Sequence, residues 1–105
     1  MSIISKESAQ AFWAGREYHN NNTICGADFD HKKTLRLWGN KIAWQDSQGN
    51  LCFCLCGWDS RTTCERLRAL GLPIWHKRGG LYCGDDLIES RGQYVYLDGK
   101  AQKIN

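Results

Sequence analysis

The sequence predicts an α+β fold, in which an N-terminal helix and a second helix at about residues 60–70 pack on a mostly antiparallel sheet of five or six short strands. Three observations support it. Apolar residues alternate along the segments between Leu35 and Leu55, which is typical of strands. Capping and stop signals enclose the second helix. Glycine-containing turns separate the strand-like runs. The 105 residues are expected to form one small domain, with a frayed tail at about residues 99–105.

The N-terminal segment is predicted to be an amphipathic helix from Ser5 to about Tyr18. A turn-rich break at residues 19–22 follows it. Thr23–Cys25 is a candidate short strand, and residues 26–34 are polar and charged, as expected for an exposed loop.

The central segment predicts a tight hairpin of Leu35–Trp38 and Lys41–Gln45, with Gly39-Asn40 as its turn, because both turn residues tolerate positive φ. A third strand is expected at Leu51–Cys56. Its alternation places three cysteines on one face and Leu51, Phe53 and Leu55 on the other, so both faces are apolar and the strand is expected to be central or covered on both sides.

The second helix is predicted to begin after an N-cap at Asp59 or Ser60. Gly71 stands where a left-handed residue ends a helix, and Pro73 prevents continuation. The apolar stripe of this helix consists of Cys64, Leu67 and Leu70.

The C-terminal third predicts a second hairpin, in which residues 74–77 and 81–83 flank Arg78-Gly79-Gly80. Residues 85–92 are expected to be irregular, with one helical turn around Leu87 and Ile88. Tyr94–Leu97 is predicted to be the last strand.

Composition limits the function classes. The net charge is +3 and the pI about 8.6, which is below the value of about 9 expected of a domain built to wrap DNA. No apolar run is long enough to span a membrane, and the first eight residues lack the apolar core of a secretory signal. We therefore expect a cytosolic protein, in which the six cysteines are mainly reduced core residues rather than disulfides.

Spaced residues of the central segment resemble a pattern found in short proteins of tailed phages and prophages that are largely without assigned function. The pattern is Leu35-x-Leu37-x-Gly39-Asn40-x-Ile42-Ala43, then Cys56-Gly57-Trp58-x-Ser60-x-Thr62-Thr63-x-Glu65-Arg66-Leu67, then Lys77-x-Gly79-x-x-Tyr82. It spans roughly residues 23–84 and does not include the Cys52/Cys54/Cys56 run. The resemblance implies a phage origin, a location in the host bacterial cytoplasm and a shared small fold. Binding to a host component follows from it by analogy.

The six cysteines are candidate metal ligands. No metal site is predicted, because a C-x-C-x-C run inside a strand spreads its sulfurs along one face, whereas zinc needs four converging ligands. If zinc did stabilise the chain, its ligands would come from Cys52, Cys54, Cys56, Cys64, Cys83 and His76. Cys83 with His76 is the one pair to consider as an activated nucleophile. No cofactor motif is present, and no enzymatic activity is expected.

Cationic and aromatic side chains are the best candidates for a binding surface. They are Lys32, Lys33, Arg36, Trp38, Lys41, Arg66, Lys77, Arg78 and Tyr82. We expect a phage-type binding module that engages a host or phage protein through such a face, as an anti-defence inhibitor or a host-takeover factor would. The alternative is a small nucleic-acid-binding protein that uses Arg36, Lys41, Arg66, Lys77 and Arg78. The sequence leaves the oligomeric state open.

Overall fold

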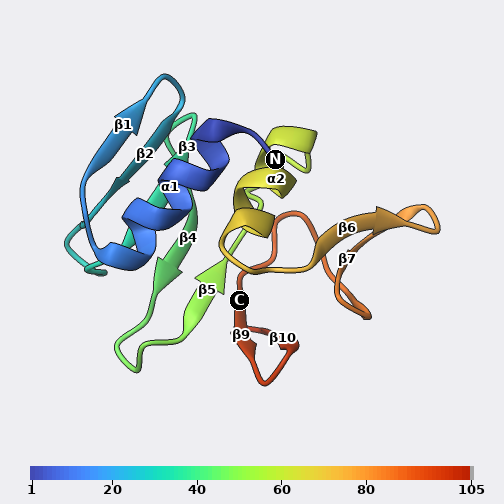
Figure 1. Cartoon of the computed structure of the whole chain (residues 1–105). Coiled ribbons are helices and arrows are strands. Elements are labelled where there is room, and N and C mark those ends of the chain that lie inside the picture. Colours follow the sequence, from blue (N-terminus) through green and yellow to red (C-terminus); the bar gives the residue numbers. More distant parts are fainter. Residues whose placement is uncertain (105) are drawn as a thin grey trace.

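The computed structural model describes residues 1–104, which form a mainly β fold with two helices, a seven-stranded sheet and a three-stranded sheet (Figure 1). The predicted α+β fold with five or six strands is therefore wrong. Three short strands that lack apolar alternation, at residues 18–20, 86–87 and 100–103, account for most of the difference. Such strands form because a neighbouring strand offers hydrogen-bond partners, so their own sequence does not reveal them.

The seven-stranded sheet is antiparallel throughout and has the order β1-β2-β3-β4-β5-β9-β10. Its strands are β1 (Tyr18–Asn20), β2 (Thr23–Gly26), β3 (Thr34–Leu37), β4 (Asn40–Gln45), β5 (Leu51–Phe53), β9 (Tyr94–Leu97) and β10 (Lys100–Lys103). Strand β5 is interior, between β4 and β9. The first five strands follow the chain order, and β9 and β10 are added from the C-terminal end.

The turn between β3 and β4 lies one residue earlier than predicted. Its central residues are Trp38 and Gly39, both with positive φ (53° and 81°), and Leu37 pairs with Asn40. This is the geometry of a primed hairpin turn, with glycine at its second central position. The register then shifts within β4, so that Ile42 is an extra residue between two paired positions.

Both helices lie on the same face of the large sheet (Figure 1). Helix α1 (Ile3–Ala14) has Ser2 as its N-cap and ends at left-handed Gly15, so it starts and stops earlier than predicted. Helix α2 (Arg61–Ala69) follows the N-cap Ser60, as the sequence indicated. After α2, the Leu72 N–H donates to the Leu67 carbonyl across left-handed Gly71, which completes a Schellman ending.

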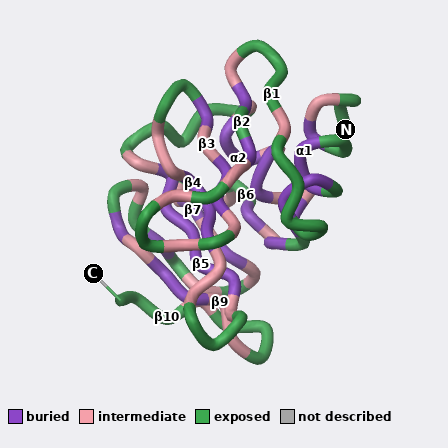
Figure 2. The backbone as a smooth tube through the Cα atoms, turned by 90° about the vertical axis from the view of Figure 1, so that its left-hand side faces the viewer, coloured by how far each residue is buried: buried purple, intermediate pink, exposed green. Residues whose placement is uncertain are grey.

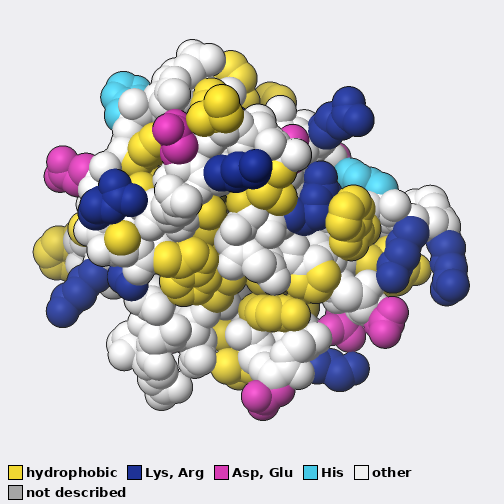
Figure 3. All heavy atoms as spheres, in the orientation of Figure 1, with side chains coloured by type: hydrophobic (Ala, Val, Ile, Leu, Met, Phe, Trp, Pro, Cys, Tyr) yellow, Lys and Arg dark blue, Asp and Glu magenta, His cyan; other side chains and the backbone are white. Residues whose placement is uncertain are grey.

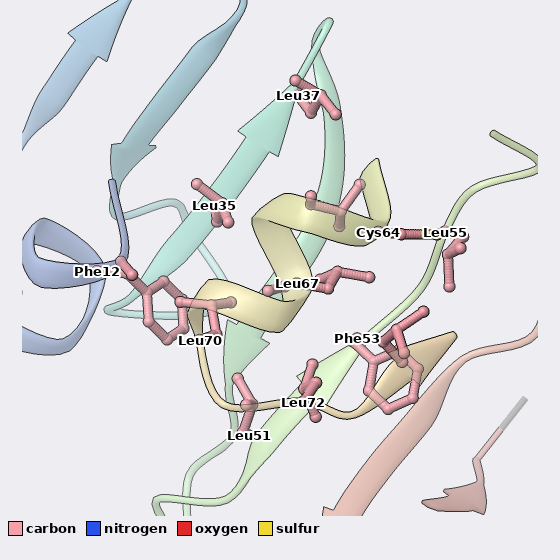
Figure 4. Close-up of a cluster of buried hydrophobic side chains, with 14 of the residues drawn as sticks. Phe12, Leu35, Leu37, Leu51, Phe53, Leu55, Cys64, Leu67, Leu70 and Leu72 are labelled. Atoms are coloured by element: carbon pink, nitrogen blue, oxygen red, sulfur yellow. The ribbon is translucent and has the colours of Figure 1, made fainter. Parts of the chain in front are cut away.

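The main core lies between these helices and the large sheet (Figure 4). It joins Phe12 of α1 and Leu67 of α2 to sheet residues such as Leu35 and Phe53. Figure 2 shows that the buried backbone runs through the middle of the molecule, while the hairpin tips are exposed. A smaller buried cluster on the opposite face of the sheet contains Trp44, Cys52, Cys54 and Val95.

The three-stranded sheet has the order β6-β7-β8 and consists of β6 (Ile74–Lys77), β7 (Gly80–Cys83) and β8 (Asp86–Leu87). Its β6–β7 hairpin projects from the body of the molecule (Figure 1). Arg78 and Gly79 form the turn, both with positive φ. Strand β8 replaces the helical turn expected around Leu87 and Ile88, because Leu87 pairs with Tyr82 of β7.

The tail predicted to be frayed is largely paired. Strand β10 continues from β9 through a turn at Asp98 and Gly99, and Lys100 pairs with Leu97. The expected fraying at residue 105 lies outside the described residues. Neither α1 nor α2 has the length and apolar character that crossing a membrane requires.

Candidate functional site

The three-stranded sheet carries an exposed face of apolar and cationic side chains. Strand alternation directs Trp75, Lys77 and Tyr82 away from the core, and Leu87 of β8 lies beside Tyr82. We call these four residues the outer face. The opposite face of the same sheet carries buried Ile74, Leu81 and Cys83. The fold therefore needs the inner residues for its core, whereas the outer face contributes little to it.

Aromatic side chains occupy the centre of the outer face. Trp75 and Tyr82 are direct cross-strand neighbours, and Leu87 pairs with Tyr82 from the adjacent strand β8. Trp75 is 53% exposed and Leu87 69% exposed. Because Gly80 has no side chain, Leu87 and Tyr82 lie close to its backbone. A Cβ at this position would lie 3.1 Å from Leu87 and 3.2 Å from Tyr82.

Two cations border these rings. The Arg68 guanidinium, from α2, lies 4.2 Å from the centre of the Trp75 ring, and its Nη1 donates to the Ile74 carbonyl at 2.9 Å. Lys77 Nζ lies 5.0 Å from the centre of the Tyr82 ring and 3.7 Å from the exposed Asp85 carboxylate. Each cation–π contact at such an exposed site is worth about 0.5–1 kcal/mol. Figure 3 shows hydrophobic and Lys or Arg side chains side by side over this region.

A shallow hollow of about 340 Å³ continues the outer face toward the helices. Its lining includes Arg68 and Trp75, together with Met1, Leu72 and Pro73. The outer face and this hollow thus form one continuous surface of aromatic, aliphatic and cationic groups.

A second cationic cluster lies on the large sheet, where the loop before β3 folds back over it. Asp28 accepts from Arg36 Nη2 at 3.0 Å, and its carboxylate lies 2.8 Å from Lys41 Nζ. The Lys41 contact holds the pKa of Asp28 well below its usual range. Lys41 also contacts His31 and lies over the ring of Trp44. Arg36 and Lys41 are therefore both held by Asp28, whose single negative charge offsets half of their combined charge.

The remaining predicted surface residues are scattered. Trp38 is 67% exposed at the β3–β4 hairpin tip. Lys32 is exposed, whereas Lys33 donates to the Trp13 carbonyl at the end of α1. Arg78 lies at the β6–β7 turn, close to Lys77 in the chain. Of the nine predicted binding residues, the structure brings Lys77, Arg78 and Tyr82 together on the small sheet.

Arg66 is an interior residue, 6% exposed. Its guanidinium donates to the Ser5 hydroxyl at 2.6 Å and to the Thr23 hydroxyl at 3.1 Å. It is therefore not available as a surface contact, for a protein or for a phosphate. Its prediction as a surface contact is therefore wrong, because its hydrogen bonds to Ser5 of α1 and Thr23 of β2 hold it in the interior.

Cys54 and Cys56 contact each other, but the cysteines and His76 do not gather at one site. Within residues 1–104, no three His, Cys, Asp or Glu side chains lie close enough to hold a metal ion. Cys64 and Cys83 belong to the main core, whereas Cys52 and Cys54 lie on the opposite face of the large sheet. Burial raises the pKa of Cys83 to about 11, and exposed His76 faces Asp59 at 3.4 Å, so the pair lacks the features of an activated nucleophile.

Three residues of the site, Trp75, Arg68 and Leu87, are absent from the predicted binding residues, and Leu87 was expected in an irregular segment. The available signal was the alternation of Ile74 to Lys77, which puts Trp75 on the same face as Lys77. Arg68 reaches Trp75 because the chain reverses at residues 71–73.

Comparison with known proteins gives one family. The model of the family described as Kyanoviridae Gp96 protein matches residues 1–86, which include both helices, the outer-face strands β6 and β7, and the start of β8. No curated protein and no solved structure matches the chain.

Proposed function

Because the chain belongs to the Kyanoviridae Gp96 protein family, which is a phage family, we propose that it is a phage-encoded, non-enzymatic protein that binds a host or phage protein through the outer face. The observation that carries the proposal is the pair of exposed side chains Trp75 and Leu87 on a sheet whose other face is buried. Exposed apolar surface bordered by polar groups is typical of protein–protein contact sites.

The residue types of the outer face support a protein partner. Trp, Tyr and Arg are the residues that most often carry binding energy at protein interfaces, and Trp75, Tyr82 and Arg68 lie together here. Trp75 and Tyr82 offer large, fairly rigid contact areas. Arg68 and Lys77 favour a partner surface that combines apolar and acidic groups.

The distribution of charge argues against nucleic acid as the partner. Of the five cations in that alternative, Arg66 is buried, and Arg36 and Lys41 are held by Asp28. Lys77 and Arg78 lie on the other sheet. A protein that binds nucleic acid usually presents a continuous cationic groove that runs along the phosphate backbone. These five positions do not form such a groove.

A protein with such a contact surface would act inside the infected cell, either as an inhibitor of a host defence protein or as a host-takeover factor. Both roles need a high-affinity interface and no catalysis. The same surface chemistry serves either role, so the partner's identity decides between them.

The test is affinity capture of the tagged full chain from a lysate of the phage's bacterial host, read by mass spectrometry. Lysates are compared with and without nuclease and at about 0.05 M and about 0.5 M salt. We expect one stoichiometric protein partner that survives nuclease and changes little with salt. Recovery that disappears after nuclease treatment would overturn the proposal in favour of nucleic acid.

Matched variants locate the surface. Trp75→Ala is expected to weaken partner binding at least about tenfold. Trp38→Ala, a comparably exposed tryptophan at the tip of another hairpin, is the control and should bind like the wild type. Thermal melting shows that both variants are folded. A larger loss for Trp38→Ala than for Trp75→Ala would assign the contact to the large sheet instead.

A further inference from the structure

The segment Cys54-Leu55-Cys56 lies at the end of β5, where the chain leaves the large sheet for α2. Cys56 and Gly57 are the central residues of a tight turn, with φ of 58° and 81°, and the Trp58 N–H donates to the Leu55 carbonyl at 2.9 Å. Cys56 thus adopts a left-handed conformation that few residues other than glycine favour. This turn folds Cys56 back toward Cys54.

The fold-back brings the two cysteines into direct contact. The Cys56 backbone N–H donates to Cys54 Sγ at 3.1 Å, and the Cys56 thiol lies 3.8 Å from the Cys54 carbonyl oxygen and 3.4 Å from that of Lys41. Hydrogen bonds donated to a sulfur favour its thiolate form. Interaction with the Cys56 side chain and its backbone N–H lowers the pKa of Cys54 against the opposing effect of burial, while the contact with Cys54, together with burial, raises the pKa of Cys56. The two groups titrate as a pair that loses its first proton readily.

The pair is accessible from one side. Cys54 is 5% exposed and packs in the small cluster with Trp44 and Val95, but Cys56 is partly exposed. The Arg91 guanidinium packs against Gly57, since a Cβ there would lie 3.2 Å from Arg91 Cζ.

The other cysteines lack this environment. Burial raises the pKa of Cys25 and Cys83 to about 11, and that of Cys52 to about 11 with a further contribution from the Asp46 carboxylate. Burial also raises the pKa of Cys64. These thiols are poor nucleophiles at neutral pH, because the thiolate is the reactive form.

We propose that Cys54 and Cys56 are a reversible thiol–disulfide pair, oxidised by a small-molecule disulfide such as glutathione disulfide. One thiolate of the pair attacks a sulfur of glutathione disulfide, which forms a mixed disulfide and releases one glutathione thiolate. The second protein thiol then loses its proton and attacks the bound sulfur, which forms the Cys54–Cys56 bond and releases the second glutathione. Two protein thiols are oxidised, one external disulfide is reduced, and the two protons end on the two glutathiones.

The proposed disulfide closes a ring of only three residues. Such a tight ring deviates from the preferred disulfide geometry, and strained disulfides are readily reduced. We therefore expect dithiothreitol to restore the dithiol form.

The test treats the purified full chain with glutathione disulfide at pH 7 and measures intact mass and peptide linkage after acid quenching. We expect a loss of two hydrogen atoms, a peptide containing the Cys54–Cys56 bond, and full reversal by dithiothreitol. Absence of the mass loss, or a disulfide that maps to other cysteines, would overturn the proposal.

Single variants separate the pair from a general effect of cysteine. Cys56→Ser should form no internal disulfide and should stop at a glutathione adduct, whereas the control Cys52→Ser should oxidise like the wild type. Circular dichroism shows that each variant is folded. The rate of iodoacetamide labelling gives an independent readout. Its pH midpoint should rise in Cys56→Ser, which lacks the second thiol, and an unchanged midpoint would contradict the pairing.

Discussion

Arg66 Nη1 donates a hydrogen bond of 2.6 Å to the hydroxyl of Ser5, and this contact joins α2 to α1 inside the protein. The same guanidinium donates through Nε to Thr23 on β2, so one side chain connects both helices and the sheet. Glu65, its neighbour in the chain, accepts from the Ser5 hydroxyl at 2.8 Å and from the Ser2 N–H at 2.7 Å. The junction is therefore a polar network at the edge of an apolar core.

Loss of the Arg66 guanidinium should destabilise the protein strongly. Arg66→Ala leaves the buried hydroxyls of Ser5 and Thr23 without this donor, and we expect the free energy of unfolding to fall by about 3 kcal/mol. The control is Arg61→Ala, an exposed arginine on the same helix, which should change it by no more than about 0.5 kcal/mol. Urea denaturation measures both. Equal effects would mean that the network contributes no stability.

Glu65 should make stability depend on acid pH. The hydrogen bonds from Ser2 and Ser5 lower its pKa from the usual 4.5 to about 2 in the folded state. Because the folded-state pKa is the lower one, the stabilisation is complete above about pH 5 and is lost as the pH falls toward 2. Glu65→Gln should therefore be less stable than the wild type at pH 7, with a difference that shrinks toward pH 2. Urea denaturation of both proteins between pH 7 and pH 2 tests this prediction. A stability difference that stays constant over this range would refute it.

Two leucines should separate stability from binding. Leu67 on α2 is fully buried, so Leu67→Ala should lower the free energy of unfolding by about 3 kcal/mol. Leu87→Ala, on the outer face, should change it by no more than about 0.5 kcal/mol while it weakens partner binding. Chemical denaturation together with the capture assay distinguishes the two. A large stability loss in Leu87→Ala would place Leu87 in the core rather than at an interface.

Gly39 and Gly57 share a φ of 81° but differ in their surroundings. Alanine at either position adopts a left-handed conformation, which costs about 1 kcal/mol. A Cβ at Gly57 also meets Arg91, whereas one at Gly39 meets nothing within 4 Å. Because the Arg91 side chain is long and exposed, we expect only about 0.5 kcal/mol of additional cost at Gly57.

Arg91→Ala isolates this additional cost. In that background, Gly57→Ala should cost no more than Gly39→Ala costs in the wild type. Thermal melting of the four variants is sufficient. An additional cost that persists without Arg91 would show that the turn backbone, rather than the guanidinium, resists the substitution.

The local signals in the sequence were informative where the deciding residues lie within a few positions of one another. Ser60 and Gly71 marked the ends of α2, and alternation separated the two faces of β5. The first helix was predicted to start at Ser5, although Ser2 is the cap and Ser5 is a buried residue inside the helix. Both Ser2 and Ser5 lie close to the start of the helix, so the sequence alone does not show which of them is the cap. The contact with α2 decides it, because α2 covers Ser5.

The candidate site was only partly predictable. Lys77 and Tyr82 were identified because hairpin pairing follows from alternation and a glycine turn. Arg68 and Leu87 were missed, since their positions beside Trp75 and Tyr82 depend on a chain reversal and on a two-residue strand. Arg36 and Lys41 were predicted as free cations, but loop residue Asp28 holds both.

By itself, the sequence determined the two helices and the β3–β4 and β6–β7 hairpins, because caps, turns and alternation act over short distances. The phage-type character of the chain followed from its resemblance to phage proteins. The tertiary structure decided which strands β1, β8 and β10 would join, and it decided that Arg66 is interior while Trp75 is exposed. These outcomes depend on contacts between residues far apart in the chain, such as Ser5 and Arg66, whose sequence separation is 61. Burial and strand pairing are properties of such contacts, and no local pattern encodes them.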